Sequence, residues 1–370
     1  MKILLVGGGT GGHFYPLIAV AESLNDTPEK PSLYYMGPEA YDEDALRLQN
    51  IKFVYCPAGK VRRYASFLNF IDFFKNVFGL KIALLKLFLI YPDVVFSKGG
   101  YTSIPVIIAA KLLAIPIVIH ESDAVPGRSS KVGAKLARYI GIAHDDVAKF
   151  FPESKTALVG IPIRKAIMLR SPNAKQSLQI PGDKPLLYIT GGSLGAERLN
   201  DQVISVLPKL LQKYYIFHQV GEKNLQEIES TVQNVVTDKN LLNSYFLQGK
   251  LSAEMVALIL SAADLIVTRA GSTTLFEIAH HQKPSILVPI PESISHDQRS
   301  NAYSYARSGA AVVLEEGNLT PSLLLQEIDS IINDRTRYHE MVQATANTSY
   351  PDAADKISEI LISIGKEHGS

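Results

Sequence analysis

The stretch that constrains the fold most is the glycine-rich segment from Gly7 to His13, which reads Gly-Gly-Gly-Thr-Gly-Gly-His. An apolar run at 2–6 precedes it and predicts a buried strand, and apolar residues at helical spacing follow it from Leu17. Glycines therefore join the end of a strand to the start of a helix. Free backbone N–H groups and the helix dipole attract phosphate to such a junction, so we predict a diphosphate site here.

His13 places a group that titrates near neutral pH beside this predicted phosphate site. We interpret it as functional rather than as a histidine that a neighbouring group merely satisfies. The segment also contains the G-x-G-x-x-G pattern of dinucleotide-binding proteins, at Gly7, Gly9 and Gly12. That interpretation needs an acidic residue at the end of the second strand. Met36 stands there instead, so we do not favour a nicotinamide cofactor.

Length and composition narrow the class of protein. A chain of 370 residues is too long for one ordinary core, so two domains are expected. The formal charge of +1 gives no general attraction to nucleic acid, and a single cysteine excludes an internal disulfide and suits a reducing compartment. The apolar run after Met1 is too short for a signal peptide. Lysines interrupt the longest apolar stretches, so no segment is expected to cross a membrane.

Apolar strands alternate with helices through the whole chain, which predicts α/β domains with doubly wound parallel sheets. The expected strands are 2–6, 33–36, 94–97, 117–120, 186–190, 216–220, 246–251, 265–268, 285–288 and 311–314. Because the pattern restarts near a polar stretch, we expect two Rossmann-like domains, 1–161 and 162–345, facing each other across a cleft with a hinge at Gly160-Ile161-Pro162. The last helix, about 346–370, is amphipathic and can pack on either domain, including back on the first.

Loops at the carboxyl ends of parallel strands meet at one edge of the sheet, where ligands bind. The loops expected there are 7–13, 98–101 and 120–123 in the first domain and 191–196 and 269–277 in the second. We interpret His120, which ends a buried strand, as structural. Glu121 is open to either a structural or a functional interpretation.

The stretch from Arg269 to Glu277 reads Arg-Ala-Gly-Ser-Thr-Thr-Leu-Phe-Glu and follows an apolar strand. Its small residues open a helix, and their backbone N–H and hydroxyl groups predict a second phosphate site without a metal. Glu277 lies about one turn into that helix, where its carboxylate can accept both hydroxyls of a ribose. Farther along, Gln298 and Asn301 offer amide groups suited to sugar hydroxyls.

The Asp42-Glu43-Asp44 run contains the Asp-x-Asp pattern by which other sugar-nucleotide transferases hold a metal ion. It stands at the start of a predicted helix, where acidic side chains interact favourably with the helix dipole, and we interpret it as structural. We therefore expect neither a bound metal nor another cofactor.

The segment from Lys60 to Lys98 crowds aromatic and aliphatic residues among seven basic residues and two acidic ones. A buried helix face does not need so many aromatic residues, whereas basic residues beside apolar ones suit a helix in an anionic membrane interface. We favour membrane contact over the alternative, a core helix with a dimer or lid surface. The residues expected at the membrane are Phe67, Phe70, Phe73, Phe74, Lys75 and Phe78.

Seven motifs carry a family resemblance that covers nearly the whole chain. They are Gly7–His13, Lys98–Tyr101, His120–Asp123, Gly160–Arg164, Gly191–Ala196, Arg269-Ala270-Gly271 with Glu277, and Gln298 with Asn301. On these motifs the chain resembles the bacterial MurG family, whose fold is the two-domain GT-B glycosyltransferase architecture. The resemblance implies inverting transfer of N-acetylglucosamine from UDP-GlcNAc to the C4 hydroxyl of undecaprenyl-pyrophosphoryl-MurNAc-pentapeptide (lipid I), giving lipid II for peptidoglycan synthesis.

The resemblance also implies roles for individual residues, with UDP-GlcNAc in the second domain and the lipid-linked acceptor in the first. For the donor it implies Leu251 by the uracil, Glu277 on the ribose, Ser193, Ser272, Thr273, Thr274 and Leu275 at the diphosphate, and Gln298 and Asn301 on the sugar. Further donor-binding residues are Thr10, Gly11, Gly12, Asp123, Arg164, Arg269 and Gly271. The acceptor-binding residues are Gly9, Thr10, Gly11, Gly12, His13, Gly99, Gly100, Tyr101 and Glu121. Residues between 60 and 86 would hold the enzyme on the anionic inner leaflet, at the cytoplasmic face of the cell membrane.

Two residues depart from the family pattern. Asp123 stands where asparagine is usual, and an aspartate cannot donate an amide hydrogen, which changes how a sugar hydroxyl would be recognised. Ile161 stands where the family usually has the asparagine of Gly-Asn-Pro, so a hinge hydrogen bond from that side chain is in doubt.

The implied reaction needs a base for the attacking hydroxyl, and His13 is the candidate, since an unperturbed imidazole titrates near about 6.5. Helix N-termini and Arg269 would stabilise the charge that grows on the leaving UDP. Three alternatives stay open. They are a UDP-sugar-dependent transferase for another glycolipid or natural-product acceptor, a noncatalytic nucleotide-sugar-binding or membrane scaffold protein, and a sugar-nucleotide epimerase.

Overall fold

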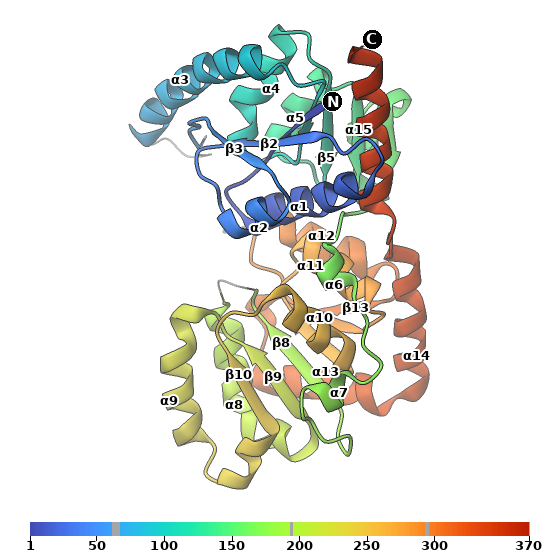
Figure 1. The fold of residues 1–370 in the computed structure, drawn as a ribbon. Coiled ribbons are helices and arrows are strands. Elements are labelled where there is room, and N and C mark those ends of the chain that lie inside the picture. Colours follow the sequence, from blue (N-terminus) through green and yellow to red (C-terminus); the bar gives the residue numbers. More distant parts are fainter. Residues whose placement is uncertain (61–66, 193–194, 293–295, 370) are drawn as a thin grey trace. The chain divides into compact units, whose positions relative to one another are not determined.

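The structure, a computed structural model, describes residues 1–60, 67–192, 195–292 and 296–369. The chain divides into two compact units, Met1–Lys165 together with Tyr350–Ser370, and Ala166–Ser349 (Figure 1). These divisions fall a few residues beyond the expected ones at 161–162 and 345–346. Each unit is built on a parallel β-sheet flanked by helices, which confirms the expected α/β class with two Rossmann-like domains.

The first unit alternates strands and helices from its first residues. Its strands are β1 (Lys2–Val6), β2 (Ser32–Gly37), β3 (Lys52–Tyr55), β4 (Val94–Ser97), β5 (Ile117–Glu121), β6 (Tyr139–Ile142) and β7 (Thr156–Leu158). Its helices are α1 (Gly11–Asp26), α2 (Glu43–Leu48), α3 (Phe67–Ile90), α4 (Ile104–Leu112), α5 (Arg128–Leu136) and α15 (Ala353–Gly369), with 3-10 turns η1 (Tyr101–Ser103), η2 (Asp145–Phe150) and η3 (Glu153–Lys155).

The seven strands of the first unit lie parallel in the order β3-β2-β1-β4-β5-β6-β7. Because helices cover both faces of such a sheet, its central strands are apolar throughout instead of alternating. Ile3 and Leu5 of β1 pack with α1 and α15, whereas Leu4 and Val6 pack with α3, α4 and α5. The strand order reverses between β1 and β4, and ligands of doubly wound sheets bind at the carboxyl ends of the strands at this point.

The last helix, α15, belongs to the first unit and lies along α1 (Figure 1). Its buried residues Ile357 and Leu361 join the core on the α1 face of the sheet. A hydrogen bond of 2.7 Å from Ser23 Oγ to Asp355 Oδ1 adds a polar contact between the two helices. The chain therefore returns to its first unit after completing the second.

The second unit repeats the alternation. Its strands are β8 (Leu186–Thr190), β9 (Tyr215–Gln219), β10 (Tyr245–Gln248), β11 (Leu265–Thr268), β12 (Ser285–Leu287) and β13 (Ala311–Val313). Its helices are α7 (Ala174–Ser177), α8 (Glu197–Lys213), α9 (Leu225–Val235), α10 (Ala253–Ala262), α11 (Ser272–His280), α12 (His296–Ala306), α13 (Pro321–Asn333) and α14 (Arg335–Ala344), and α6 (Lys165–Met168) spans the boundary. Its 3-10 turns are η4 (Glu222–Asn224), η5 (Lys239–Ser244), η6 (Glu316–Asn318) and η7 (Thr345–Thr348).

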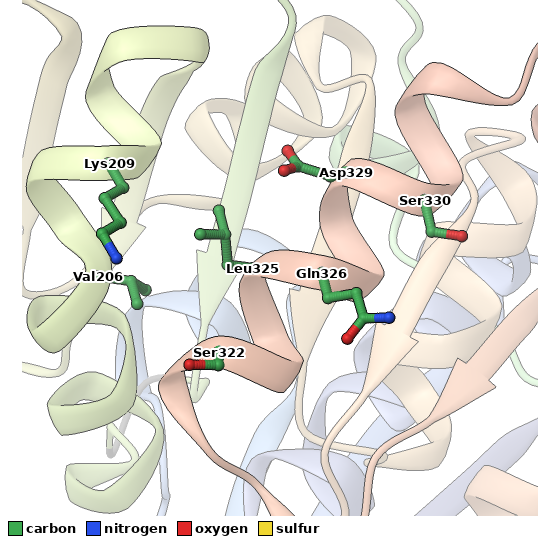
Figure 2. A pocket seen from close by; sticks show the side chains of 7 residues that line it. All are labelled: Val206, Lys209, Ser322, Leu325, Gln326, Asp329 and Ser330. Atoms are coloured by element: carbon green, nitrogen blue, oxygen red, sulfur yellow. The ribbon is translucent and has the colours of Figure 1, made fainter.

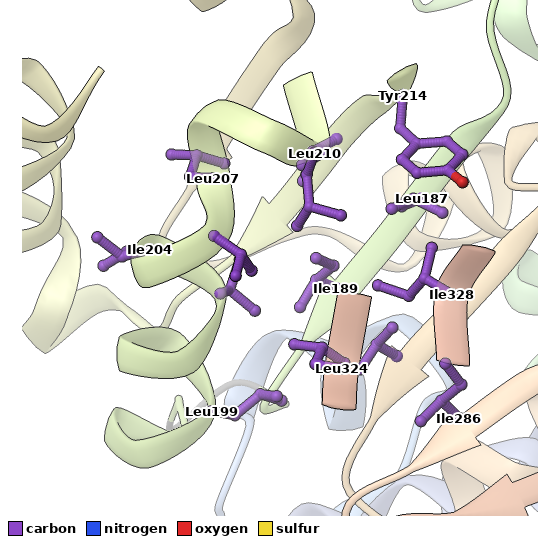
Figure 3. Packing of buried hydrophobic residues seen from close by; sticks show 14 of the residues in the cluster. Leu187, Ile189, Leu199, Ile204, Leu207, Leu210, Tyr214, Ile286, Leu324 and Ile328 are labelled. Atoms are coloured by element: carbon purple, nitrogen blue, oxygen red, sulfur yellow. The ribbon is translucent and has the colours of Figure 1, made fainter. Parts of the chain in front are cut away.

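The six strands of the second unit are also parallel, in the order β10-β9-β8-β11-β12-β13. Leu187 and Ile189 of β8 pack against α8 through Leu207 and against α13 through Leu324 and Ile328 (Figure 3). The strand order of this sheet reverses between β8 and β11. A second ligand-binding edge is therefore expected beside the loops that follow these two strands.

The strands differ from the sequence prediction in two ways. The strand expected at 246–251 ends at Gln248, so Leu251 lies in the following loop. Three strands of the first unit, β3, β6 and β7, were not predicted. β3 and β7 are short edge strands whose side chains are mostly exposed or half-buried, and β6 contains Gly141, so none has the apolar run typical of a central strand.

Within the described residues, no helix combines the length and the apolar character that a membrane span requires.

Candidate active site

Two glycine loops meet at the carboxyl edge of the first sheet, one after β1 and one after β4. Gly9 (φ +86°) and Gly100 (φ +79°) have positive φ values that side-chain-bearing residues rarely adopt. A Cβ on Gly9 would lie 2.8 Å from the ring of Tyr101, and one on Gly100 would lie 2.8 Å from the carbonyl oxygen of Gly8. The loops therefore pack backbone to backbone, and only glycine fits at these two positions.

The first loop leads directly into α1 and leaves the start of this helix open. Thr10 is the extended N-cap residue, and among the described residues no side chain caps the helix or places an acid in its first turn. Gly11 is half-buried and Gly12 is exposed, and neither carries a side chain that could cover the start of the helix. This arrangement is typical of a site that binds a phosphate anion.

The ring of His13 is oriented by the second glycine loop. Its Nδ1 lies 3.1 Å from the carbonyl oxygen of Lys98. Because a carbonyl can only accept, Nδ1 carries the hydrogen and Nε2 has the free lone pair. Burial, and next the Lys98 ammonium, lower the pKa of His13 to about 4, while Asp123 and the hydrogen bond to Lys98 act in the opposite direction. The imidazole is therefore neutral at pH 7 and can accept a proton at Nε2.

Glu121 ends β5 and is almost fully buried. Its Oε1 accepts from the N–H of Asp123 at 2.9 Å and its Oε2 from the N–H of Gly127 at 3.1 Å. Burial, and next the charge of Asp123, raise the pKa of Glu121 to about 6. Both carboxylate oxygens thus hold the loop 122–127 in place. Glu121 was expected as an acceptor ligand, and these contacts give it a structural role as well. His120 has the structural role expected of it, since its Nε2 lies 2.7 Å from the carbonyl oxygen of Gly160.

Tyr101 and Arg164 each take part in a contact between an aromatic ring and a cationic side chain. The half-buried Tyr101 ring lies against Gly9, with the ammonium of Lys60 5.3 Å from its centroid. The guanidinium of Arg164 lies 4.0 Å from the ring centroid of Tyr15, close enough for a cation–π interaction. The hydroxyl of Tyr15 donates to Asp42 Oδ2 at 3.3 Å. Asp42 also caps α2 by accepting from the Ala45 N–H. This agrees with the interpretation of the Asp42-Glu43-Asp44 run as the start of a helix.

In the second unit the corresponding loops follow β8 and β11. Ser193, which was expected at the diphosphate, lies outside the described residues. Its neighbour Gly192 is described, has φ +79°, and donates its N–H to Thr190 Oγ1 at 2.9 Å. Gly195 also has φ +79°, and a Cβ there would lie 2.2 Å from the carbonyl oxygen of Val220. Gly192 is thus held at the end of β8, and Gly195 packs against the residue that follows β9.

The loop after β11 opens α11 with small residues. Gly271 is its extended N-cap residue and has no side chain with which to cap the start of the helix. Thr273 and Thr274 are half-buried at the first turn, and Glu277 follows, also half-buried, in the second turn. Ser272 and Leu275 are buried, and the N–H of Leu275 donates to the carbonyl oxygen of Gly271 at 3.1 Å.

Three of the expected donor-binding side chains are held by other parts of the second unit. Arg269 donates from Nη1 to the carbonyl oxygen of Val288 at 3.0 Å and pairs through Nη2 with the buried carboxylate of Glu316. Gln298 accepts from the N–H of Ile290 at 3.3 Å, and Asn301 is 1% exposed. Arg269 thus ties its loop to the residue that follows β12 and to η6.

The sequence interpretation missed one support of the site and named a second, Lys98, only as part of the loop 98–101. Tyr35 is buried and donates its hydroxyl to the carbonyl oxygen of Gly7 at 2.8 Å, which anchors the first loop. Lys98 is 1% exposed and follows β4 directly, and a charged residue at the end of an apolar strand was the available signal.

Leu251, expected near the uracil, lies half-buried in the loop after β10.

A separate pocket of about 530 Å³ lies between α8 and α13 (Figure 2). Val206 and Lys209 contribute from α8, and Leu325 and Asp329 are among the residues from α13. These side chains lie along helices and not in the loops at the carboxyl ends of the strands. We therefore do not include the pocket in the candidate active site.

Comparisons with known proteins agree with this geometry across both units. The glycosyltransferase family 28 N-terminal domain matches residues 3–142, and the family 28 C-terminal domain matches residues 186–357. A Clostridium kluyveri protein named UDP-N-acetylglucosamine–N-acetylmuramyl-(pentapeptide) pyrophosphoryl-undecaprenol N-acetylglucosamine transferase is 32% identical over 97% of this chain and 98% of its own length. A Treponema denticola protein of the same name is 31% identical over 97% of this chain and 96% of its own.

Solved structures give the same result. Acinetobacter baumannii MurG is 27% identical, with a TM-score of 0.74 over 98% of this chain and 100% of that chain. The UDP-GlcNAc 2-epimerase of Neisseria meningitidis has a TM-score of 0.72 over 98% of this chain and 100% of its own, but at 14% identity it shows the shared fold alone. With relatives above 30% identity that align over nearly their full length, the chain belongs to the MurG family of glycosyltransferases.

Proposed function

We propose that the protein transfers N-acetylglucosamine from UDP-GlcNAc to the C4 hydroxyl of the muramyl sugar of lipid I, with inversion, and so forms lipid II for peptidoglycan synthesis. The observation that carries this proposal is the alignment with proteins of that name over 97% of the chain, which spans the glycine loops of both units. The carboxyl edges of the two sheets supply two candidate phosphate sites, as a reaction between two diphosphate substrates requires.

His13 is the proposed general base. Its Nδ1–H donates to the Lys98 carbonyl at 3.1 Å, which leaves Nε2 to take the proton of the C4 hydroxyl as that oxygen attacks the anomeric carbon of the donor. The bond from the anomeric carbon to the UDP oxygen breaks in the same step, and UDP leaves with the bonding electrons. A low pKa keeps His13 neutral before reaction, and the negative diphosphate of a bound acceptor would raise its basicity.

The acceptor diphosphate is proposed to bind the open start of α1 and the neighbouring loop 98–100. Uncapped N–H groups at Gly11 and Gly12 support this, together with the close packing of the two loops. Tyr101 and the cation of Lys60 beside it would line the approach of the muramyl sugar. Glu121 is proposed to act through the loop 122–127 that it holds.

The donor is proposed to bind the second unit, with its diphosphate at the start of α11. The N-terminus of the helix and the hydroxyls of Thr273 and Thr274 can stabilise the negative charge of the leaving UDP without a cofactor or a metal ion. Glu277 would accept the ribose hydroxyls, and Gln298 and Asn301 would order the wall around the sugar. Activity that survives excess EDTA would support this part of the proposal, and activity restored only by a divalent cation would contradict it.

Helix α3 is proposed to hold the protein on the anionic cytoplasmic leaflet of the cell membrane, as a peripheral protein. Phe70, Phe73, Phe74 and Phe78 are each more than half exposed, although aromatic side chains normally avoid water. Lys75 lies among them with its side chain 57% exposed, 3.6 Å from the buried carboxylate of Asp72. The side chain of Phe67, which was expected to join this set, lies outside the described residues.

The experiment that tests the proposal offers the purified protein labelled UDP-GlcNAc and two acceptors, a short-chain lipid I analogue and diacylglycerol. Labelled disaccharide lipid from the lipid I analogue supports the proposed acceptor. Transfer to diacylglycerol alone would favour another glycolipid transferase. Conversion of UDP-GlcNAc to its epimer without any acceptor would favour an epimerase, and tight binding without turnover would favour a noncatalytic protein.

A further inference from the structure

Glu316 is a buried carboxylate at the start of η6 and is bonded to two arginines. Its Oε1 accepts from Arg198 Nη1 at 3.1 Å, and its Oε2 pairs with Arg269 Nη2. The side chains of Glu316 and Arg269 are 4% and 12% exposed, whereas that of Arg198 is 69% exposed. Each carboxylate oxygen therefore serves a different arginine, one of them buried and the other at the surface.

The two arginines belong to the two loops that open helices at the carboxyl edge of the second sheet. Arg198 lies in the first turn of α8, directly after the glycine loop that follows β8. Arg269 follows β11 and stands two residues before Gly271, the N-cap residue of α11. Glu316 follows β13, which lies three strands from β8 in the sheet order, or about 14 Å. Its carboxylate therefore connects the loop after the edge strand to both central loops.

The preceding residue, Glu315, makes contacts of the same kind with α12. Its Oε1 accepts from Arg299 Nε at 2.8 Å and from the Tyr303 hydroxyl at 2.7 Å. Arg299 also donates from Nη1 to Glu292 Oε1 at 3.2 Å. Helix α12 carries the amide side chains proposed to order the wall around the donor sugar. The side chains of Glu315 and Arg299 are 35% and 44% exposed, so this pair contributes less than the buried one.

The guanidinium of Arg269 is bonded to the protein on both of its terminal nitrogens. Nη1 donates to the Val288 carbonyl oxygen at 3.0 Å, and Nη2 pairs with Glu316. Because the side chain is mostly buried, removing the carboxylate would leave a positive charge without compensation, which is strongly destabilising. The same pairing offsets the charge that Arg269 would otherwise present to an anionic ligand.

We propose that Glu316 is a positioning residue of the donor site, which sets the loops after β8 and β11 through Arg198 and Arg269. Arg269 then acts through this pairing and not as a direct ligand of the UDP diphosphate. The negative charge of the diphosphate is left to the start of α11. This inference rests on the proposed function for the assignment of the donor to the second unit. It does not depend on which acceptor the enzyme uses.

The first test compares the affinity for UDP, measured by calorimetry, in Glu316→Gln and Glu327→Gln. Glu327 is the matched control, since it is 19% exposed and pairs with Arg337 in the same unit, between α13 and α14. Glutamine keeps the shape of the side chain and removes its charge. We expect Glu316→Gln to bind UDP about tenfold or more weakly, and Glu327→Gln to bind it as wild type does, although both lose stability to urea.

Steady-state transfer is the second measurement. Glu316→Gln should raise KM for UDP-GlcNAc by about tenfold or more and leave KM for the lipid I analogue unchanged, because the loops of the first unit keep their contacts. If Glu316→Gln fails to fold, Glu316→Asp replaces it. Aspartate keeps the charge but is one methylene shorter, so it cannot span both arginines, and the same loss is expected. Wild-type affinity for UDP in either variant would overturn the proposal.

The role of Arg269 is tested by combining Glu316→Gln with Arg269→Gln. The double variant leaves no buried charge at this position, so it should bind UDP no worse than Glu316→Gln alone. Losses that multiply in the double variant would overturn the proposal and indicate that Arg269 contacts UDP directly. Tighter UDP binding in Glu316→Gln would also overturn it, because Glu316 would then compete with the diphosphate for Arg269.

Hydrogen exchange of the free protein separates this inference from the proposed function. Peptides that cover the starts of α8 and α11 should exchange faster in Glu316→Gln and at the wild-type rate in Glu327→Gln. If wild type fails to glycosylate lipid I but exchange and UDP affinity respond as expected, the positioning role stands and the proposed function fails. If transfer to lipid I is efficient but neither responds to Glu316→Gln, the inference fails alone.

Discussion

At the residue scale, the proposed chemistry depends on which nitrogen of His13 carries the proton. The Lys98 carbonyl, 3.1 Å from Nδ1, decides this, because it can accept a hydrogen but cannot donate one. The low pKa of about 4 then ensures that Nε2 is unprotonated over the whole physiological range. A base of low pKa is a weak one, so in the proposed mechanism the negative charge of the acceptor diphosphate would raise the basicity of His13.

His13→Asn tests this assignment. The asparagine amide can still donate to the Lys98 carbonyl but has no lone pair to act as base. We expect kcat to fall by roughly 10²- to 10⁴-fold, while the affinity for UDP-GlcNAc, measured by calorimetry, stays unchanged. The exposed His339→Asn serves as the control. An unaltered kcat would remove His13 from the chemistry.

His218 gives a pH prediction in the second unit. It is buried, lies 2.8 Å from the Tyr245 hydroxyl and 3.1 Å from Asn200 Oδ1, and burial lowers its pKa to about 3. The unfolded chain takes up this proton below about pH 6.5 and the native protein does not, so its contribution to stability falls as the pH drops from 6.5 toward 3. The stability difference between wild type and His218→Gln should therefore shrink by about 2–3 kcal/mol between pH 7 and pH 4.5.

The measurement is urea unfolding followed by circular dichroism at both pH values. Leu207→Ala, a change in the same core without a titrating group, is the control, and its difference from wild type should stay constant. A His218→Gln difference that does not change with pH would contradict the burial of a neutral imidazole.

Individual side chains also show where sequence reasoning stops. Glycines and a histidine in one loop, at the end of an apolar strand, were enough to locate His13 and the start of α1. The burial of Asn301 and Leu275 and the pairing of Arg269 with Glu316 depend on residues distant in the sequence. Motif spacing contains no information on such contacts, so it could name these residues but could not say which of their atoms face a ligand.

At the scale of elements, the conformations of the two glycine loops depend on each other. Gly100 has φ +79° and ψ 163°, a region essentially limited to glycine, and a Cβ there would meet the carbonyl of Gly8. The loop after β4 and the loop after β1 therefore pack closely at Gly100 and Gly8. This coupling explains why two segments separated by about ninety residues of chain both need glycine.

Gly100→Ala should separate the loops. We expect kcat/KM for the lipid acceptor to fall by about tenfold or more, with a lower unfolding temperature, because backbone strain and a steric clash act together. The control is Gly182→Ala, where the described structure leaves open space around the added Cβ. Equal acceptor kinetics in Gly100→Ala and wild type would show that the loops do not need this close packing.

Helix α3 carries the prediction about the membrane. Its buried side, including Ala83 and Leu87, packs on the first unit, while Phe73 and Phe74 are 61% and 55% exposed. Replacing both phenylalanines by alanine should weaken sedimentation with phosphatidylglycerol vesicles by about tenfold or more, since their burial in the interface is lost. Leu112→Ala, which removes an exposed apolar residue elsewhere, is the control. Unchanged vesicle binding would favour a dimer or lid surface instead.

The central strands were predictable and the edges were not. β1, β4, β8 and β11 are apolar on both faces because helices cover both faces of each sheet, and such runs are visible in any sequence. β3, at the edge of its sheet, has an almost entirely exposed pattern, and only pairing with β2 identifies it as a strand. Edge strands depend on their neighbour, which a one-dimensional pattern does not contain.

At the scale of the whole molecule, the chain builds the same architecture twice. Each sheet reverses its strand order once, between β1 and β4 or between β8 and β11, and each reversal carries a glycine loop and an uncapped helix start. The repeated pattern was readable from the sequence because the strand–glycine–helix motif occurs in both halves. The sequence left open whether α15 returns to the first unit, because an amphipathic helix can pack on any apolar face.

In the proposed reaction, His13 assists a single direct displacement of UDP by the C4 hydroxyl of lipid I. The most direct measurement is the anomeric configuration of the disaccharide formed from ¹³C-labelled UDP-GlcNAc and a lipid I analogue, determined by NMR. We expect a β-1,4 linkage in wild type and no detectable product in the same time with His13→Asn. An α linkage, or a β-linked product formed equally fast without His13, would contradict it.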